Sequence, residues 1–301
     1  MPPDLLFRGT APALVTPFTP EGALDEAALE RLVDRQIEGG VDALVVLGTT
    51  GENPTLTPAE RQRVTERAVA HTAGRVPVIV GTGTNNTAES VRFSREAAAA
   101  GADALLVVGP YYNKPPADGL VAHVSAIAEA ADLPIVFYNV PGRTGQNIPA
   151  DLTLRLAEEI PHVVGIKEAS GDLAQIADVL AHRPQGFAVY AGDDELTLPL
   201  VALGADGVVS VLVNALPKKF CQMVHLALNG DVEAARSRHF ELLPAMRACF
   251  MTANPIPVKM VLAVLGVCEE TVRLPLVPPD PRLRWQILSA FKIEANMPAK
   301  A

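Results

Sequence analysis

The sequence predicts an α/β fold in which eight parallel strands close into a (β/α)8 barrel of the TIM type, followed by a C-terminal helical extension. Eight short apolar segments occur along the first two thirds of the 301-residue chain, most of them about thirty residues apart, close to one βαβ unit. Several, such as 43–47 and 104–108, are almost continuously apolar, as strands buried on both faces must be. Segments with helical periodicity lie between them, which favours a closed barrel.

The strands and the first helix follow in chain order. Residues 28–37 carry apolar side chains at helical spacing, and Gly39 with Gly40 is expected to end that helix. Strands are expected near residues 12–16, 43–48, 77–81, 104–109, 134–139, 163–167, 188–192 and 206–211.

Capping residues mark two further helices. Thr57, Pro58 and Glu60 supply an N-cap, a proline at the first helical position and a capping-box glutamate. Residues 86–89 repeat this pattern without the proline. These signals place a helix after the second strand and another after the third.

The C-terminal part of the chain is expected to be helical. Residues 217–295 have this pattern throughout, with Pro255, Pro257 and Pro275 marking breaks. We therefore divide the chain into a barrel that carries the active site, 1–216, and an extension, 217–301, packed on it as one structural unit. A doubly wound nucleotide-binding sheet is the rival fold, but the glycine-rich run 81–85 lacks the third glycine of the dinucleotide pattern.

Composition excludes several classes of function. The formal charge of -9 argues against non-specific binding to nucleic acid or to an anionic membrane surface. Three cysteines without paired spacing indicate neither a disulfide framework nor a zinc site. The six histidines show no metal-ligand pattern, and Asp193 beside Asp194 is a weak signal for a cation, so no metal is expected. Residues 1–4 lack the start of a signal peptide, and no segment has the length of a membrane span, so a cytoplasmic protein is expected.

Catalytic groups of such barrels come from the C-terminal ends of the strands, and this rule selects a short set of residues. Lys167 closes the apolar strand 163–166, where burial would lower its pKa and leave a neutral amine that can attack a carbonyl carbon. A strand-end lysine that reaches solvent or pairs with Glu168 is an equally good interpretation. The polar strand ends are 48–52, 109–113, 138–145 and 166–168.

Other groups at this rim suit a small carboxylate or a proton relay. Tyr138 and the pair Tyr111-Tyr112 are three of only four tyrosines, and a phenol can relay protons, although each can also be a wedge between loops. Thr49 and Thr50 offer hydroxyls and N–H groups in a glycine-flanked turn, which can also be simply a tight loop. Arg143 has the planar fork that matches carboxylates, with a solvated loop arginine as the alternative.

Together these motifs resemble the dihydrodipicolinate synthase / N-acetylneuraminate lyase family, from about residue 9 to 292. The arginine-bearing loop and the tyrosine pair resemble its synthase branch, because the sialic-acid lyases lack both. The resemblance is carried by the segments Gly48-Thr-Thr-Gly-Glu52, Tyr111-Tyr-Asn-Lys-Pro115, Tyr138-Asn-Val-Pro-Gly-Arg-Thr-Gly145, Gly165-Ile-Lys-Glu-Ala169, Gly192-Asp-Asp194 and Asn254-Pro-Ile-Pro-Val-Lys259.

The resemblance implies a Schiff-base lyase that condenses pyruvate with L-aspartate-4-semialdehyde in lysine and diaminopimelate biosynthesis, without metal or organic cofactor. Lys167 would form the Schiff base, and Tyr138 would exchange protons through Thr49 and Tyr112. Tyr112 would come from the neighbouring subunit of a tight dimer within a homotetramer. The residues that the resemblance assigns to substrate binding are Thr50, Val209 and Gly192 around pyruvate and Arg143 on the carboxylate of the semialdehyde.

In lysine-inhibited relatives a cleft at the dimer interface binds free lysine. Asn85, Glu89 and Tyr111 match that possible allosteric site. Pro58 and Arg61 stand where the inhibited enteric-type enzymes have histidines, and Asn53 and Pro54 also differ. A positive charge on Arg61 would repel the ammonium group of lysine, so feedback inhibition is not expected to follow from the resemblance.

Two other functions compete with the synthase. An aldolase or dehydratase acting on a 2-keto-3-deoxy sugar acid would keep Lys167 and Tyr138 but change the residues that face the second substrate. A non-catalytic barrel that senses a keto acid would not need Lys167, Tyr138 and Thr49 together. Arg143 and Tyr112 favour the synthase over the first alternative.

Overall fold

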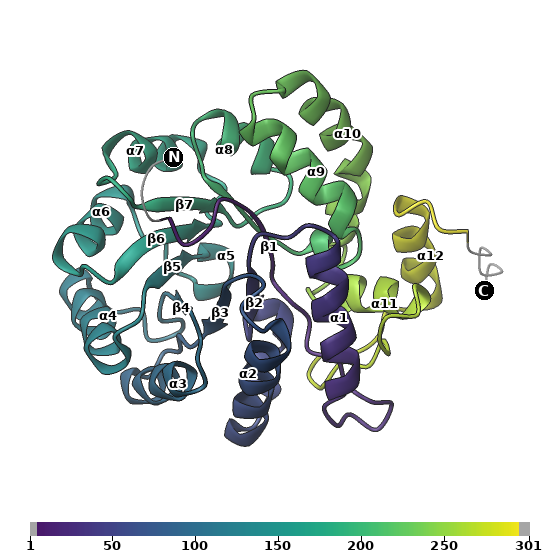
Figure 1. Cartoon of the computed structure of the whole chain (residues 1–301), viewed down its shortest axis with the longest axis horizontal. Helices are drawn as coiled ribbons and strands as arrows, with labels where there is room; N and C mark the ends of the chain where they lie inside the picture. The colour runs from purple at the N-terminus through teal and green to yellow at the C-terminus, as the bar shows by residue number, and fades with distance from the viewer. Residues whose placement is uncertain (1–4, 295–301) are drawn as a thin grey trace.

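The computed structural model describes residues 5–294, in which eight parallel strands curl into a barrel (Figure 1). Neighbours around the sheet follow the chain order, and β1 pairs with β8. β1 and β2 meet through a bridge from Ala13 to Val45 and a hydrogen bond from the Leu14 N–H to the Val45 carbonyl, 2.8 Å. The strands are β1 Gly9–Pro12, β2 Leu44–Val46, β3 Val78–Gly81, β4 Ala104–Val108, β5 Ile135–Asn139, β6 Val163–Glu168, β7 Ala188–Ala191 and β8 Gly207–Ser210.

The predicted strands are confirmed to within one or two residues, except the first. β1 ends at Pro12, where 12–16 was predicted. Residues 13–16 are buried and mostly apolar, as a strand would be, but their backbone pairs with neighbouring strands only at Ala13 and Leu14. Asn214 instead accepts a hydrogen bond from the Val15 N–H, 3.1 Å, and donates one to the Ala13 carbonyl, 2.8 Å. Residues 13–16 therefore have the apolar pattern of a strand because they are buried under the segment that contains Asn214.

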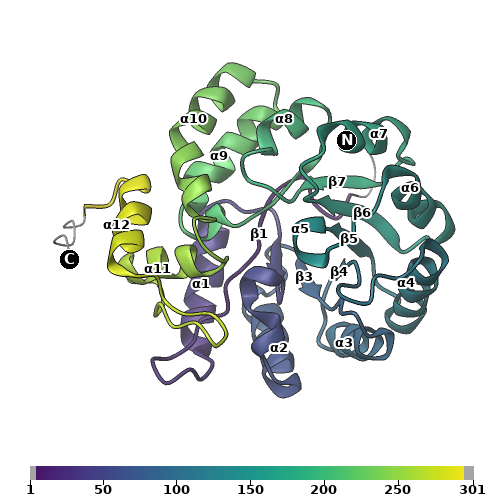
Figure 2. The ribbon, with the colours of Figure 1, turned by 180° about the vertical axis from the view of Figure 1, so that it is seen from behind.

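Helices surround the barrel, and Figure 2 shows the short α5, Pro141–Thr144, over its middle. α5 is brief because it only turns the chain after β5, and it carries Arg143 above the barrel. The surrounding helices are α1 Glu26–Glu38, α2 Pro58–Thr72, α3 Thr87–Ala99, α4 Ala117–Ala131, α6 Ala150–Glu159, α7 Leu173–His182, α8 Thr197–Ala202 and α9 Pro217–Leu228.

The predicted caps of α1, α2 and α3 are confirmed, except for the role of Glu89 in α3. α1 ends at Gly39 as expected, and Thr57 and Glu60 form the capping box of α2. Asn86 caps α3 by accepting hydrogen bonds from two N–H groups, 3.0 and 3.4 Å. Glu89 does not complete a capping box, because its carboxylate is bound by Arg92 at 2.6 Å.

The extension contains α10 Val232–Ala248, α11 Ile256–Val264 and α12 Pro281–Ala290, which lie on one side of the barrel (Figure 1). The prediction that 217–295 is helical throughout is wrong for 265–280, which contains no helix, and residue 295 lies outside the described residues. Pro257 does not break a helix, because it lies in the first turn of α11, where proline is tolerated. α9 packs against β1 and α1, so we propose that it serves as the eighth barrel helix and that the extension begins after it.

Two hydrophobic clusters stabilise this arrangement, one between barrel and helices and one inside the barrel. Phe7 stacks on Tyr190 with ring centroids 4.1 Å apart, and the Tyr190 hydroxyl donates to the Phe7 carbonyl, 2.9 Å. Because Phe7 precedes β1, this contact fills the end of the barrel opposite the strand ends that carry the polar motifs. Within residues 5–294, no helix combines the length and apolar character that a membrane crossing needs.

Candidate active site

Lys167 is buried near the end of β6, with only 5 % of its surface exposed. Its Nζ lies 4.3 Å from the centre of the Tyr138 ring on the neighbouring strand β5. Burial lowers the pKa of Lys167 to about 8; the Asp194 carboxylate acts in the opposite direction, and the Arg143 charge adds to the lowering. A minority of the amine that is far larger than for an ordinary lysine is therefore neutral near physiological pH, as a nucleophile toward carbonyl carbon requires.

The alternative pairing of Lys167 with Glu168 does not occur. Successive side chains of a strand point to opposite faces, so the two residues face away from each other. The Glu168 carboxylate instead accepts hydrogen bonds from the Asn139 amide, 3.1 and 3.2 Å, and from the Ser170 N–H, 2.7 Å. Within residues 5–294, Lys167 takes part in no salt bridge.

Tyr138 is buried beside Lys167 and stays protonated at neutral pH. Burial raises the pKa of its phenol to about 12, although the Arg143 charge and a hydrogen bond with Thr49 act in the opposite direction. A neutral phenol that is bonded to a hydroxyl can donate a proton and accept one back along the same path. The contact between Tyr138 and Thr49 is thus suited to a short proton relay.

A cavity of about 240 Å³ opens above Lys167 at the C-terminal ends of the strands. It brings together predicted residues from β5, β6 and α5 and from the segments that follow β2 and β7, namely Thr49, Thr50, Tyr138, Arg143, Lys167 and Gly192. Gly192 is needed here for its size, because a Cβ at this position would lie 2.7 Å from the Cβ of Ala169. The volume suits a small keto acid with room for a second small molecule.

Two predicted residues do not line this cavity. Val209 lies lower in β8, paired with Ala11 and buried in the barrel interior, and Val211 just beyond the strand lines the cavity instead. Tyr112 lies in the loop after β4 with 89 % of its surface exposed. Its φ of 69° places the backbone in the left-handed region.

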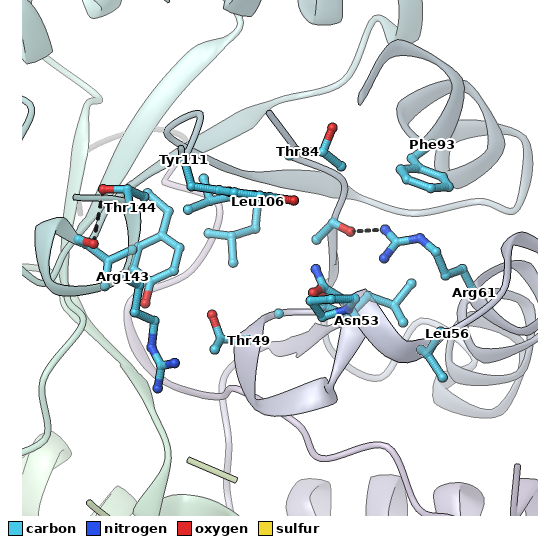
Figure 3. A pocket seen from close by; sticks show the side chains of 18 residues that line it. Thr49, Asn53, Leu56, Arg61, Thr84, Phe93, Leu106, Tyr111, Arg143 and Thr144 are labelled. Atoms are coloured by element: carbon cyan, nitrogen blue, oxygen red, sulfur yellow. Dashed lines mark hydrogen bonds between the residues drawn. The ribbon is translucent and has the colours of Figure 1, made fainter. Parts of the chain in front are cut away.

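A second cavity, of about 280 Å³, adjoins the first and shares Thr49, Tyr138 and Arg143 with it (Figure 3). Of the possible lysine-site residues, Tyr111 lines it, whereas Asn85 and Glu89 do not.

Arg61 reaches this second cavity from α2 (Figure 3). Its guanidinium stacks 4.0 Å from the centre of the Phe93 ring and donates to the Gly81 carbonyl, 2.7 Å. Burial lowers the pKa of Arg61 to about 10, which still leaves it charged at neutral pH. The cavity thus contains a fixed positive charge.

Three residues around the Lys167 cavity were given no catalytic or substrate-binding role from the sequence. Asp194 is buried, its pKa is raised to about 6 by burial, and it accepts a hydrogen bond from the Leu212 N–H, 2.8 Å. Asn254 and Phe250 reach the cavity from the C-terminal part of the chain. Asn254 belongs to the segment 254–259 that contributes to the resemblance, whereas no sequence signal pointed to Phe250. Within residues 5–294, no group of three or more His, Cys, Asp or Glu side chains is arranged to hold a metal ion.

Comparison with known proteins agrees with this geometry. A profile of the dihydrodipicolinate synthetase family matches residues 6–293. The 4-hydroxy-tetrahydrodipicolinate synthase of Salinibacter ruber is 64% identical over 290 residues, which cover 96% of each chain. A crystal structure of the dihydrodipicolinate synthase of Acinetobacter baumannii with pyruvate is 41% identical with a TM-score of 0.92, covering 95% of this chain and 98% of that one.

A third relative is the synthase of Cyanidioschyzon merolae, whose crystal structure was determined with lysine bound. It is 41% identical, with a TM-score of 0.93, and the alignment covers 96% of this chain and 98% of that one. The fold and the site together define a lyase of the Schiff-base aldolase class on a (β/α)8 barrel. Within that class, the chain belongs to the dihydrodipicolinate synthetase family.

Proposed function

We propose that this enzyme is a 4-hydroxy-tetrahydrodipicolinate synthase, which condenses pyruvate with L-aspartate-4-semialdehyde in lysine and diaminopimelate biosynthesis. The observation that carries the proposal is Lys167, whose pKa is lowered to about 8 and whose Nζ lies 4.3 Å from the Tyr138 ring. Its relatives with this name cover almost the whole chain.

The reaction begins with attack of the neutral Lys167 amine on the keto carbon of pyruvate. Water leaves as the carbon–nitrogen double bond forms, and Tyr138 supplies the proton that the departing oxygen needs. The resulting iminium withdraws electrons, so the methyl group gives a proton back to the Tyr138 oxygen and becomes the nucleophilic carbon of an enamine. That carbon attacks the aldehyde carbon of the semialdehyde and forms the new carbon–carbon bond. The aldehyde oxygen takes the proton from Tyr138, and the enamine becomes an iminium again.

Two residues are proposed to hold the carboxylates. Thr50, beside Lys167 in the cavity, donates its hydroxyl to the carboxylate of pyruvate. Arg143 is exposed on α5 and lines both cavities, so it meets the carboxylate of the semialdehyde at the mouth of the site. The backbone at Gly192 completes the pyruvate pocket, and we do not place Val209 in contact with it.

The second substrate is tested with pyruvate and a panel of aldehydes, in the wild type and in Arg143→Ala. We expect turnover with L-aspartate-4-semialdehyde, and in Arg143→Ala a rise of its KM of roughly ten- to a hundredfold, because a charge-assisted contact contributes about 1.5–3 kcal/mol. The KM for pyruvate should change little. Arg31→Ala, on the exposed face of α1, serves as a control for the loss of an arginine.

Preferential turnover of a sugar-acid aldehyde would replace this proposal with that of a 2-keto-3-deoxy sugar-acid aldolase. Equal damage to both substrates by Arg143→Ala would show that the residue supports the loop and does not bind the semialdehyde.

We further propose that the active form is a cytoplasmic homotetramer built from tight dimers. Tyr112 supports this, because it is 89 % exposed and lines neither cavity of its own chain. An exposed tyrosine beside the catalytic rim is well placed to enter the site of a neighbouring subunit, where it would extend the relay of Tyr138 and Thr49.

We also propose that free lysine does not inhibit this enzyme through the cleft at Tyr111. Arg61 holds a buried positive charge there, and an ammonium group would meet it in a site of low polarity. Millimolar L-lysine should leave the wild-type rate unchanged, whereas Arg61→Met, which removes the charge and keeps most of the volume, should become sensitive. Inhibition curves for the wild type and Arg61→Met test this, and strong inhibition of the wild type would contradict it.

A further inference from the structure

The loop that presents Thr49 and Thr50 begins and ends in strained backbone. Leu47 has φ 57° and Glu52 has φ 53°, both in the left-handed region that residues with a Cβ rarely adopt. Such conformations persist only where surrounding contacts enforce them. The contacts that hold this loop therefore matter for the site it forms.

At Glu52, these contacts come from the C-terminal part of the chain. The Lys259 Nζ donates to Glu52 Oε1, 2.7 Å, and both side chains are completely buried. Lys259 also donates to the Thr271 carbonyl, 2.6 Å, and the Arg273 N–H donates to Glu52 Oε2, 3.0 Å. A buried carboxylate is thus matched by a buried ammonium, more than two hundred residues away in sequence.

At Thr50 the contact is more direct. The Asn254 Nδ2 donates to Thr50 Oγ1 at 2.9 Å, and both residues are buried and line the Lys167 cavity. A threonine hydroxyl has one proton and two acceptor lone pairs. Because Oγ1 accepts from Asn254, its own proton points elsewhere, and no group within residues 5–294 accepts a hydrogen bond from it.

We infer that Asn254 and Lys259 are positioning residues of the active site, through which the C-terminal helices orient Thr50 toward a carboxylate. Asn254 directs the Thr50 proton into the cavity, and Lys259 holds Glu52 so that the loop 48–52 keeps its conformation. The inference rests on the proposed function, because it requires a keto acid carboxylate bound next to Lys167.

The test is a double-mutant cycle with Thr50→Val, Asn254→Ala and the combined variant, measured by the KM for pyruvate and by borohydride trapping of pyruvate. Each single change should raise the KM for pyruvate roughly tenfold, the effect of one hydrogen bond to a charged group. The combined variant should be no worse than Thr50→Val, because Asn254 acts through the hydroxyl that this change removes. The KM for the semialdehyde should stay within about twofold of the wild type.

Additive effects in the combined variant would overturn the inference. They would mean that Asn254 binds the substrate itself, through the second N–H of the Nδ2 group that donates to Thr50. The melting temperature of each variant is measured to show that it folds. If Asn254→Ala does not fold, Asn254→Asp keeps the size, removes the donor and enters the same cycle. Asn229→Ala, at the exposed end of α9, should leave the KM for pyruvate unchanged.

Lys259 is tested together with Glu52, since Lys259→Met alone leaves a buried carboxylate without a partner. The pair Glu52→Gln with Lys259→Met removes both charges and is expected to fold. Its KM for pyruvate should remain raised several-fold, because the loop loses the charged anchor even where stability is restored. A folded pair with wild-type KM for pyruvate would show that Lys259 only stabilises the fold.

Trapping in the wild type separates this inference from the proposed function. Absence of an adduct on wild-type Lys167 would defeat the proposed function. An adduct on the wild type together with an unchanged KM for pyruvate in Thr50→Val and Asn254→Ala would defeat the inference alone.

Discussion

Replacing Lys167 with methionine should abolish the covalent reaction with pyruvate and lower kcat by on the order of 10⁴-fold or more, the range found when a covalent nucleophile is removed. Methionine keeps much of the volume but has no amine to form the carbon–nitrogen bond. Incubation with pyruvate and borohydride, followed by peptide mass analysis, should place the reduced adduct on the Lys167 peptide of the wild type and on no peptide of the variant. The variant should be at least as stable at pH 7, because it lacks an ammonium that is costly to bury.

The pH dependence of trapping tests the same assignment. With a pKa of about 8, about a quarter of the Lys167 amine is neutral at pH 7.5, against about 0.1% for the ordinary value of 10.5. The trapping rate should therefore rise with pH and level off above about 8. For stability the sign is the same: the native pKa lies below the unfolded one, so the unfolded state binds more protons and stability from this group rises with pH between about 8 and 10.5.

Two other lysines provide the comparison. Lys114 is exposed in the loop after β4, and Lys259 is buried but bound to Glu52 at 2.7 Å. Neither lysine lines the Lys167 cavity, so both should stay unmodified. An adduct on Lys114 or Lys259 with an unmodified Lys167 would refute the catalytic assignment.

Mixing two inactive variants should restore activity if Tyr112 completes the site of its neighbour. Tyr112→Phe removes a hydroxyl and keeps the ring, and Tyr138→Phe does the same at the buried position. In a mixed dimer, one site carries both changes and the other carries neither. With equal amounts and random exchange, half of the dimers are mixed, so about a quarter of wild-type activity should return from nearly none.

Subunit exchange is verified by a mass or affinity tag on one variant, and each variant incubated with a tagged copy of itself is the control. Tyr112→Phe should keep the oligomeric state of the wild type, because the ring remains. No recovery after verified exchange would mean that Tyr112 acts within its own barrel or not in catalysis.

The interior of the barrel could be predicted from sequence because burial on both faces leaves a direct trace in composition. The segments 43–48 and 104–109 were predicted to within two residues of β2 and β4. The segment 12–16 was misplaced because its apolar residues pack under Asn214 and the rim, and burial there does not require a strand. Sequence periodicity reports burial, and only the hydrogen-bond ladder distinguishes a strand from other buried chain.

The rim could be predicted only in part. That Lys167, Tyr138, Thr49 and Arg143 line one cavity could be predicted, because strand ends converge at one edge of a parallel barrel. The sequence could not predict that Val211 lines the cavity in place of Val209, because this depends on where β8 ends and on the direction of the next turn.

By itself the sequence determined that parallel strands form a barrel and that Lys167 and the polar strand ends lie at one rim, because these conclusions rest on local periodicity and on the rule that parallel strand ends meet. Only the tertiary structure decided that Lys167 is buried away from Glu168, that Tyr112 faces outward, and that Asn254 and Lys259 reach Thr50 and Glu52. These last contacts join segments about two hundred residues apart, and the burial that lowers the pKa of Lys167 arises only in the folded barrel.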